Sequence, residues 1–218
     1  MTWISVLEEF SIWIILLPAI TGFLLLKKLD DDSRIIFLVV LLAFGPQVLK
    51  SFLDGTRVLT VVYNVYTPME FIVYWIFFRR KITSQVRKKT LDVMACFFLM
   101  ISAYLVYQNN IFERFLNEWV VLSNIFQVSW VGLCLLEYYY SEDGLINSSQ
   151  PFFWFLIAIT GYASCTAVFF SLWHLIKNNT GEQFYIVNAI HHIFNTLLYI
   201  FFTIGFLKNL NKYHNWTI

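Results

Sequence analysis

Seven long apolar stretches run along the chain, separated by short polar segments. A helix needs roughly 20 mostly apolar residues to cross the hydrocarbon core of a bilayer. Each stretch meets this need, so the pattern predicts an all-α protein with seven transmembrane helices. The predicted spans are Phe10–Leu26, Ile35–Phe52, Val58–Phe78, Leu91–Tyr107, Trp119–Tyr139, Pro151–Ile176 and Phe184–Leu207.

Prolines interrupt the first three of these spans, at Pro18, Pro46 and Pro68. Because proline has no backbone N–H, we expect kinks in these helices, with neighbouring helices satisfying the freed carbonyl groups. The run Gly45-Pro46-Gln47 is expected to break the second span in its middle. The residues beyond Leu207 are polar, which predicts a frayed tail.

The composition agrees with a membrane location. Of the 218 residues, 59% are hydrophobic and only 13% are charged, against about 25% charged in average proteins. Only short connections remain between the spans, so residues 1–218 are expected to form one transmembrane domain in the inner (plasma) membrane, with no soluble domain. This excludes a built-in kinase, nuclease or nucleotide-binding module and a nucleic-acid partner. Recognition must then occur within the bundle or through a separate protein.

The basic residues are distributed unevenly between the two ends of the predicted bundle. Loops rich in Lys and Arg stay in the cytoplasm, which places the N-terminus outside and the C-terminus in the cytoplasm. The densest basic run, Arg79–Lys89, is explained by this topology; the alternative is a surface for anionic lipid or a cytoplasmic signalling partner. Eleven of the 15 basic residues lie on the predicted cytoplasmic side: Lys27, Lys28, Arg34, Arg79, Arg80, Lys81, Arg87, Lys88, Lys89, Lys208 and Lys212.

A carboxylate, Glu70, lies near the middle of the third span. An acid at that depth costs about 2.5–3.5 kcal/mol on insertion scales, so we expect it to face other helices or water and to be protonated or paired. The polar residues of this span follow the i, i+3, i+4, i+7, i+11 spacing of one helical face. They are Tyr63, Tyr66, Thr67, Glu70 and Tyr74. Lys50 is expected to reach for the outer surface rather than for Glu70.

The seventh span repeats this spacing with Asn188, His191, His192, Asn195 and Tyr199. In the predicted topology both helices run from outside to inside, which places the two polar stripes at similar depth. The shared pattern is consistent with a 3+1+3 helix repeat. The alternative is that any amphipathic membrane helix shows this spacing.

Polar residues of the third, fifth and seventh spans together predict an intramembrane ligand-binding cluster. The fifth span adds Asn124 and Gln127. The sixth span carries Thr160, Ser164 and Ser171, which we assign to hydrogen bonds between helices. The predicted cluster consists of Tyr63, Asn64, Tyr66, Thr67, Glu70, Tyr74, Asn124, Gln127, Asn188, His191, His192, Asn195 and Tyr199.

The sequence carries no motif of a known catalytic centre. Membrane hydrolases of the ceramidase and adiponectin-receptor kind hold zinc with several His residues and an acid. Here His191 and His192 are adjacent, so they point about 100° apart on a helix and do not share an ion easily. No G-x-S-x-G elbow or phosphate-binding loop is present. We therefore expect no enzyme, no metal and no cofactor.

Two resemblances concern the whole seven-helix plan. Pro46-Gln47 and the N-outside topology resemble the PQ-loop and sugar-transporter group, which implies a transporter of small solutes; here the dipeptide lies in the second span and has no counterpart in the sixth. The runs NVYTPME over Asn64–Glu70 and NAIHHIFN over Asn188–Asn195 resemble small uncharacterised seven-helix bacterial membrane proteins. This second resemblance implies no activity.

Three functions remain open. The leading hypothesis is a sensor or receptor-like module that holds a small ligand or a proton at the polar cluster and passes the change to a cytoplasmic partner. The alternative is a transporter that uses the same cluster as its midplane site, with prolines as hinges. A metal-dependent membrane hydrolase comes third.

Overall fold

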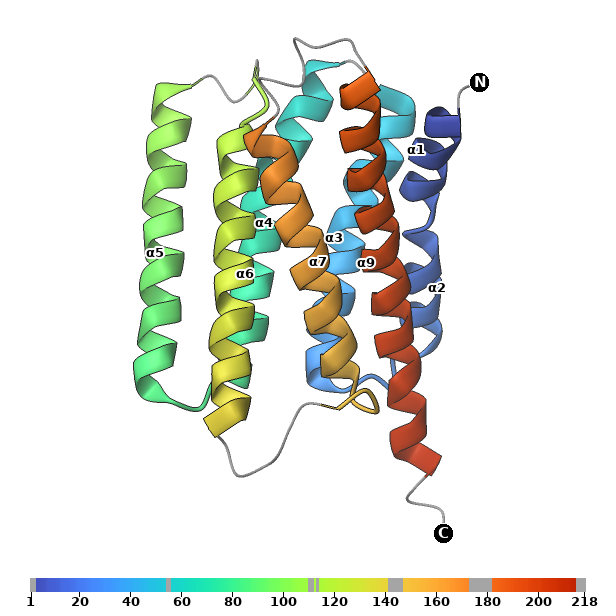
Figure 1. The fold of residues 1–218 in the computed structure, drawn as a ribbon, viewed down its shortest axis with the longest axis vertical. Helices are drawn as coiled ribbons and strands as arrows, with labels where there is room; N and C mark the ends of the chain where they lie inside the picture. The colour runs from blue at the N-terminus through green and yellow to red at the C-terminus, as the bar shows by residue number, and fades with distance from the viewer. Residues whose placement is uncertain are drawn as a thin grey trace.

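The computed structural model describes residues 3–53, 56–109, 112, 114–140, 147–172 and 182–214, which form helices and connecting turns without a strand. Figure 1 shows the spans side by side, running alternately up and down, with α1 and α2 in line as one span. They are α1 (Trp3–Trp13), α2 (Leu16–Leu24), α3 (Asp31–Leu53), α4 (Arg57–Lys81), α5 (Gln85–Gln108), α6 (Asn117–Tyr140), α7 (Pro151–Ser171) and α9 (Glu182–His214). Seven spans in the described part of the chain are long and apolar enough to cross a membrane, which confirms the predicted class.

The first span is two helices rather than one kinked helix. α1 ends at Trp13 and α2 begins at Leu16, so the break lies just before Pro18. Because proline cannot donate to the carbonyl four residues earlier, the Ile14 carbonyl needs another donor. The Leu17 amide supplies it, at 3.0 Å, in a tighter turn. Together, α1 and α2 still provide one span, over Val6–Leu24.

The other two internal prolines do not interrupt their helices. α3 continues through Pro46 and α4 continues through Pro68. The expectation that Gly45-Pro46-Gln47 breaks the second span is therefore wrong. A single proline removes one hydrogen bond, and the packing of α3 against α4 holds the helix on both sides of the gap.

The C-terminal helix continues past its predicted end. α9 runs to His214 rather than ending at Leu207, so the predicted frayed tail is wrong for this segment. The reason lies at Asn209, a buried residue whose amide nitrogen donates to Ser33 Oγ at 2.9 Å. Its oxygen accepts from the Asp30 amide at 3.2 Å. These bonds fix the end of α9 against the start of α3.

α7 ends at Ser171, before the predicted end of the sixth span at Ile176. Residue 176 lies outside the described residues, as do His174 and the stretch 173–181. α7 packs against both α6 and α9, whereas α5 lies at the edge of the bundle against α4 and α6. The outer faces carry large exposed apolar side chains, among them Phe23, Val93 and Met100, as contact with lipid requires.

Aromatic rings fill the half of the bundle in which α4 ends. Phe71 stacks on Phe98 with 3.8 Å between ring centroids and lies 4.7 Å from Trp130. Further along, Phe155 of α7 contacts Phe202 and Phe206 of α9, with centroids 5.9 and 5.7 Å apart. These rings interdigitate between the helices, and such cores are packed as densely as organic crystals.

Ion pairs at the same end of the bundle join consecutive helices. Arg80 of α4 contacts Asp31 and Asp32 at the start of α3, at 3.2 and 3.4 Å. Lys81 pairs with Asp32, and Arg79 pairs with Asp92 of α5 at 2.9 Å. Much of the basic run Arg79–Lys89 is thus neutralised within the protein.

Glu137 of α6 closes the turn between α4 and α5. Its carboxylate accepts from the Thr83 and Ser84 amides at 2.9 and 3.0 Å and pairs with Arg87 at 2.5 Å. Free amides at a helix N-terminus carry partial positive charge and favour an acid. Glu137 therefore caps α5 from a neighbouring helix. No pattern in the sequence distinguishes Glu137 as a cap.

Candidate functional site

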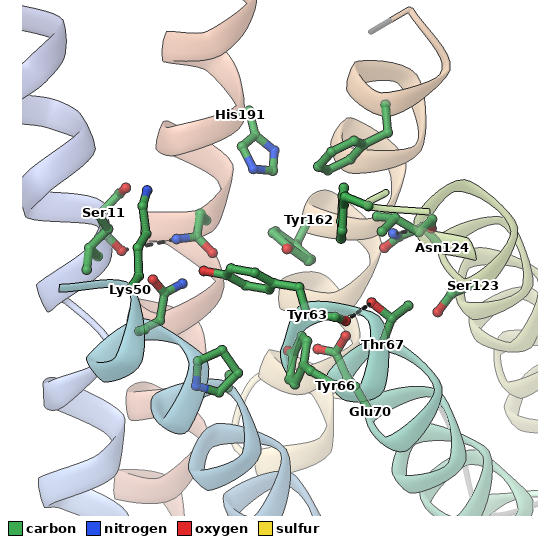
Figure 2. A pocket seen from close by; sticks show the side chains of 18 of the residues that line it. Ser11, Lys50, Tyr63, Tyr66, Thr67, Glu70, Ser123, Asn124, Tyr162 and His191 are labelled. Carbon is green, nitrogen blue, oxygen red and sulfur yellow. Dashed lines mark hydrogen bonds between the residues drawn. The ribbon is translucent and has the colours of Figure 1, made fainter. Parts of the chain in front are cut away.

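A cavity of about 420 Å³ lies among α1, α3, α4, α6, α7 and α9. Its walls come from the half of the bundle opposite the aromatic rings: the last turns of α3 and α7 and the first half of α4 (Figure 2). The lining residues are Ser11, Ile12, Ala43, Pro46, Gln47, Lys50, Leu59, Tyr63, Tyr66, Thr67, Glu70, Phe115, Val120, Ser123, Asn124, Tyr162, Phe170, His191, His192, Asn195 and Tyr199.

α4 supplies the most polar wall, through the stripe predicted from the sequence. Tyr63, Tyr66, Thr67 and Glu70 all line the cavity. The Thr67 hydroxyl donates to the Tyr63 carbonyl at 3.1 Å, inside its own helix. The Tyr63 ring extends across the cavity toward the side on which Lys50 lies (Figure 2). Glu70 therefore lies deep on one side, and Lys50 lies on the other.

Glu70 is surrounded by phenol groups. The Tyr66 hydroxyl, one helical turn earlier, donates a hydrogen bond to its carboxylate. Tyr162 of α7 and Tyr199 of α9 lie close enough to interact electrostatically with the carboxylate from across the cavity. No ion pair among the described residues includes Glu70.

The two adjacent histidines of α9 both line the cavity but have different surroundings. The Nδ1 of His192 lies 2.7 Å from Ser11 Oγ of α1. Because the single hydroxyl proton of Ser11 is donated to the Glu8 carbonyl at 2.8 Å, His192 is the donor in this contact. The His191 ring instead stacks on Phe169, with centroids 4.6 Å apart.

Asn195 completes the contact between α9 and the first helix. Its amide nitrogen donates to the Ser11 carbonyl at 3.1 Å. Ser11 is fully buried and is thus bound through both its hydroxyl and its carbonyl. His192 and Asn195 therefore hold α1 in place at the cavity wall, one turn before the break between α1 and α2.

α3 contributes Pro46, Gln47 and Lys50 to the cavity. The Lys50 ammonium lies 3.3 Å from the Glu8 carboxylate of α1. As expected, Lys50 is not the partner of Glu70, although it lines the cavity rather than lying only at the outer surface. Within the described residues, Gln47 Oε1 is buried without a hydrogen-bond donor.

α6 contributes Ser123 and Asn124. The Asn124 side chain is only 4% exposed, and its nitrogen donates to the Val120 carbonyl at 2.6 Å. Because a carbonyl only accepts, this bond fixes the orientation of the amide. Its oxygen, Oδ1, finds no donor among the residues that the structure describes.

The structure brings most of the predicted cluster together. The residues that line the cavity are Tyr63, Tyr66, Thr67, Glu70, Asn124, His191, His192, Asn195 and Tyr199. Tyr74 lies deeper, in the core, and Gln127 is buried against the Ser123 hydroxyl at 3.1 Å. Asn64 of α4 binds the backbone at Arg114 and Leu116, so its side chain contacts the α5–α6 connection and does not line the cavity. Asn188 is half-buried outside the cavity lining.

Several cavity residues carry no signal in the sequence pattern. Ser11 and Tyr162 belong to no polar stripe with helical spacing that the sequence analysis predicts, and Gln47 stands out only as part of the Pro46-Gln47 dipeptide. In the sixth span the polar residues singled out from the sequence face elsewhere: Ser164 is exposed, and Thr160 lines an apolar groove between α6 and α7. Only the helix packing shows which polar side chain of an apolar helix points inward.

Within the described part of the chain, no group of three or more His, Cys, Asp and Glu side chains is placed to hold a metal ion. Comparison with protein families, curated proteins and solved structures finds no match to this chain. The function is therefore argued from the cavity and its chemistry.

Proposed function

We propose that this multi-pass membrane protein is a receptor-like module that binds a small ligand in the cavity beside Glu70. One observation carries the proposal: polar residues from six helices, far apart in the sequence, converge on one cavity with a carboxylate inside it. A buried acid in a membrane helix is costly and is retained at functional sites.

The size and lining of the cavity suit a small molecule. Ligand pockets enclose about 300–1,000 Å³, are mostly apolar and contain a few convergent polar groups. The cavity volume of about 420 Å³ falls in this range. Apolar surface comes from Ala43, Leu59 and Phe115, and hydrogen-bonding groups come from the α4 and α9 stripes.

The arrangement along the membrane normal supports a receptor. The cavity lies in one half of the bundle, and the aromatic rings around Phe71 and Phe155 fill the other. In the proposed orientation the cavity is on the outer side and the ion pairs of Arg79–Lys81 are on the cytoplasmic side. α4 carries both the cavity wall at Glu70 and these ion pairs, so a ligand-induced shift of α4 reaches the cytoplasmic end directly.

The cytoplasmic partner remains part of the proposal. Arg79, Arg80, Lys81 and Arg87 are engaged in ion pairs with acids of the bundle. Of the run Arg79–Lys89, a partner protein or anionic lipid at this end would therefore meet chiefly Lys88 and Lys89. The basic run has, in addition, a structural role that the sequence alone did not indicate.

A transporter of small solutes is the second candidate, and the broken first span favours it. Discontinuous helices beside a site near the bilayer midplane are typical of secondary transporters. Here the break between α1 and α2 follows directly after Ser11 and Ile12, both of which line the cavity. Transport would additionally require the aromatic rings below Glu70 to separate.

The test compares ligand binding by the parent protein and by the Glu70→Gln variant, with Glu118→Gln as the matched control. Glu118 is an exposed acid paired with Arg114 outside the cavity. Purified protein in detergent is screened with small metabolites for a rise in melting temperature, which follows ligand occupancy. We expect hits for the parent and for Glu118→Gln, and their loss in a folded Glu70→Gln protein. Equal responses in all three proteins would exclude the cavity as the site.

Flux separates the two candidates. For a hit that depends on Glu70, uptake of the labelled compound into proteoliposomes is measured against empty liposomes. Binding without uptake supports the receptor-like module, and saturable uptake supports the transporter.

A further inference from the structure

The cavity contains one acidic side chain without a cationic partner among the described residues. Of the charged side chains in its lining, Lys50 is balanced by Glu8 at 3.3 Å. Glu70 has only a phenol as a hydrogen-bond partner, and the ion pairs of the described residues do not reach it. In a site of low dielectric constant a carboxylate strongly favours a positive charge close by.

Two side-chain oxygens in the cavity lining are hydrogen-bond acceptors without a donor among the described residues, and His191 Nδ1, which donates or accepts according to its tautomer, also has no partner there. Asn124 is nine-tenths buried, and its orientation leaves the carbonyl oxygen without a donor in the described chain. Gln47 likewise presents a buried oxygen without a donor. A buried acceptor that lacks its bond costs about 1–3 kcal/mol. A ligand that brings hydrogen-bond donors would remove this cost.

Aromatic faces line the same space. Tyr66 of α4 and Tyr162 of α7 line the cavity near Glu70, and the Tyr63 ring crosses the cavity toward Lys50. The face of a phenol ring attracts a cation that lies within about 6 Å of its centroid, and the attraction grows when water is excluded. A carboxylate beside several such rings is a chemical complement to an ammonium group.

From these three observations we infer that the ligand is a small organic cation of the amine class, with its ammonium group against Glu70. The inference rests on the proposed function, because it names the ligand class of the same cavity. An anionic ligand would add a like charge to Glu70. A neutral ligand would supply no counter-charge, so Glu70 would have to stay protonated beside it.

The experiment uses charge-matched probes on the purified full-length protein. Benzylamine and phenethylamine supply the cation, benzyl alcohol and 2-phenylethanol are neutral counterparts of similar shape, and benzoate and phenylacetate are anionic ones. Melting temperature and calorimetric Kd are measured for the parent, Glu70→Gln and Glu118→Gln. Tyr162→Phe and Tyr162→Leu test the ring, since only Leu removes the aromatic face.

We expect the two amines to stabilise the parent and Glu118→Gln and the other four probes to have little effect. Glu70→Gln should weaken amine binding roughly tenfold or more, as loss of a charge-assisted hydrogen bond does. Tyr162→Phe should retain the affinity, whereas Tyr162→Leu should lose several-fold. If Glu70→Gln fails to fold, the comparison of Tyr162→Phe with Tyr162→Leu takes its place, because both of these variants retain the Glu70 carboxylate.

Three results would overturn the inference. One is stabilisation by neutral or anionic probes equal to that by amines; binding in the cavity would then stand and only the ligand class would be wrong. Another is amine binding that is unchanged in both Glu70→Gln and Tyr162→Leu. The third is no response of the parent to either amine, in which case the metabolite screen alone decides the proposed function.

Discussion

The side-chain nitrogen of Asn195 on α9 donates to the backbone carbonyl of Ser11 on α1, at 3.1 Å, across a separation of 184 residues. Next to it, His192 bonds to the hydroxyl of the same serine. The last span thus closes the bundle onto the first, beside the cavity. The short α1 depends on this contact, because its own helix stops at Trp13.

Asn195→Leu should destabilise the protein. Hydrogen bonds between membrane helices contribute about 0.6 kcal/mol on average and up to about 1.7 kcal/mol. We expect the loss of stability to lie toward the upper value, because the bond is buried and joins the last span to the first. Asn188→Leu on the same helix is the control, and it should change stability less. Thermal unfolding in detergent measures both; a larger loss for Asn188→Leu contradicts the assignment.

Glu137→Ala should be among the most destabilising substitutions at the charged end. It removes the cap of α5 and leaves Arg87, whose side chain is 25% exposed, without its partner; because water screens the partly exposed arginine, the cost should lie below the about 3–5 kcal/mol of a fully buried pair. Glu137→Gln keeps acceptors for the Thr83 and Ser84 amides and should cost less. Glu118→Ala is the control, because its exposed pair with Arg114 contributes only about 0–1 kcal/mol. Equal melting temperatures for Glu137→Ala and Glu118→Ala would exclude the capping role.

Two glycine substitutions should have opposite effects. A Cβ at Gly205 of α9 would collide with the buried ring of Phe155, which is itself held between Phe202 and Phe206. Overpacking of this kind costs about 1–3 kcal/mol, so Gly205→Ala should lower the melting temperature.

Gly132→Ala meets no atom within 4 Å and should stabilise α6 by up to about 1 kcal/mol through helix propensity. The pair is compared by thermal unfolding in one detergent. A rise in melting temperature for Gly205→Ala would mean that α7 and α9 pack less closely at Phe155 than described, and a fall for Gly132→Ala would contradict the open surroundings of Gly132.

The orientation in the membrane is tested by reporter fusions. A cytoplasmic reporter fused after Lys212 should be active, and one inserted between Lys177 and Glu182 should report the outer side, as the distribution of basic residues predicts. The two ends of α9, next to which the reporters are placed, lie at opposite ends of the bundle (Figure 1). Activity of both reporters on one side of the membrane would contradict the seven-span topology.

The sequence alone determined the class of the protein and the stripe of α4. Long apolar stretches in a membrane form helices because no other open structure satisfies the backbone there, so length and hydropathy are sufficient to find them. The Tyr63–Glu70 face follows from the helix period: side chains return to the same face about every 3.6 residues, so the spacing along the chain is sufficient to group them. The 3+1+3 repeat stays a prediction.

Only the tertiary structure decided which polar residues meet Glu70 and how each is engaged. Ser11, Gln47 and Tyr162 come from three different helices. Because each of these helices carries apolar residues on all its faces, no local pattern shows which face turns toward the cavity. Packing likewise directs the Asn64 side chain to the backbone of the α5–α6 connection, and it brings His192 of α9 into contact with Ser11 of α1. It also paired Lys50 with Glu8 and so left Glu70 without a cation. The charge balance between distant segments depends on distances in space, and the order of residues along the chain does not give these distances.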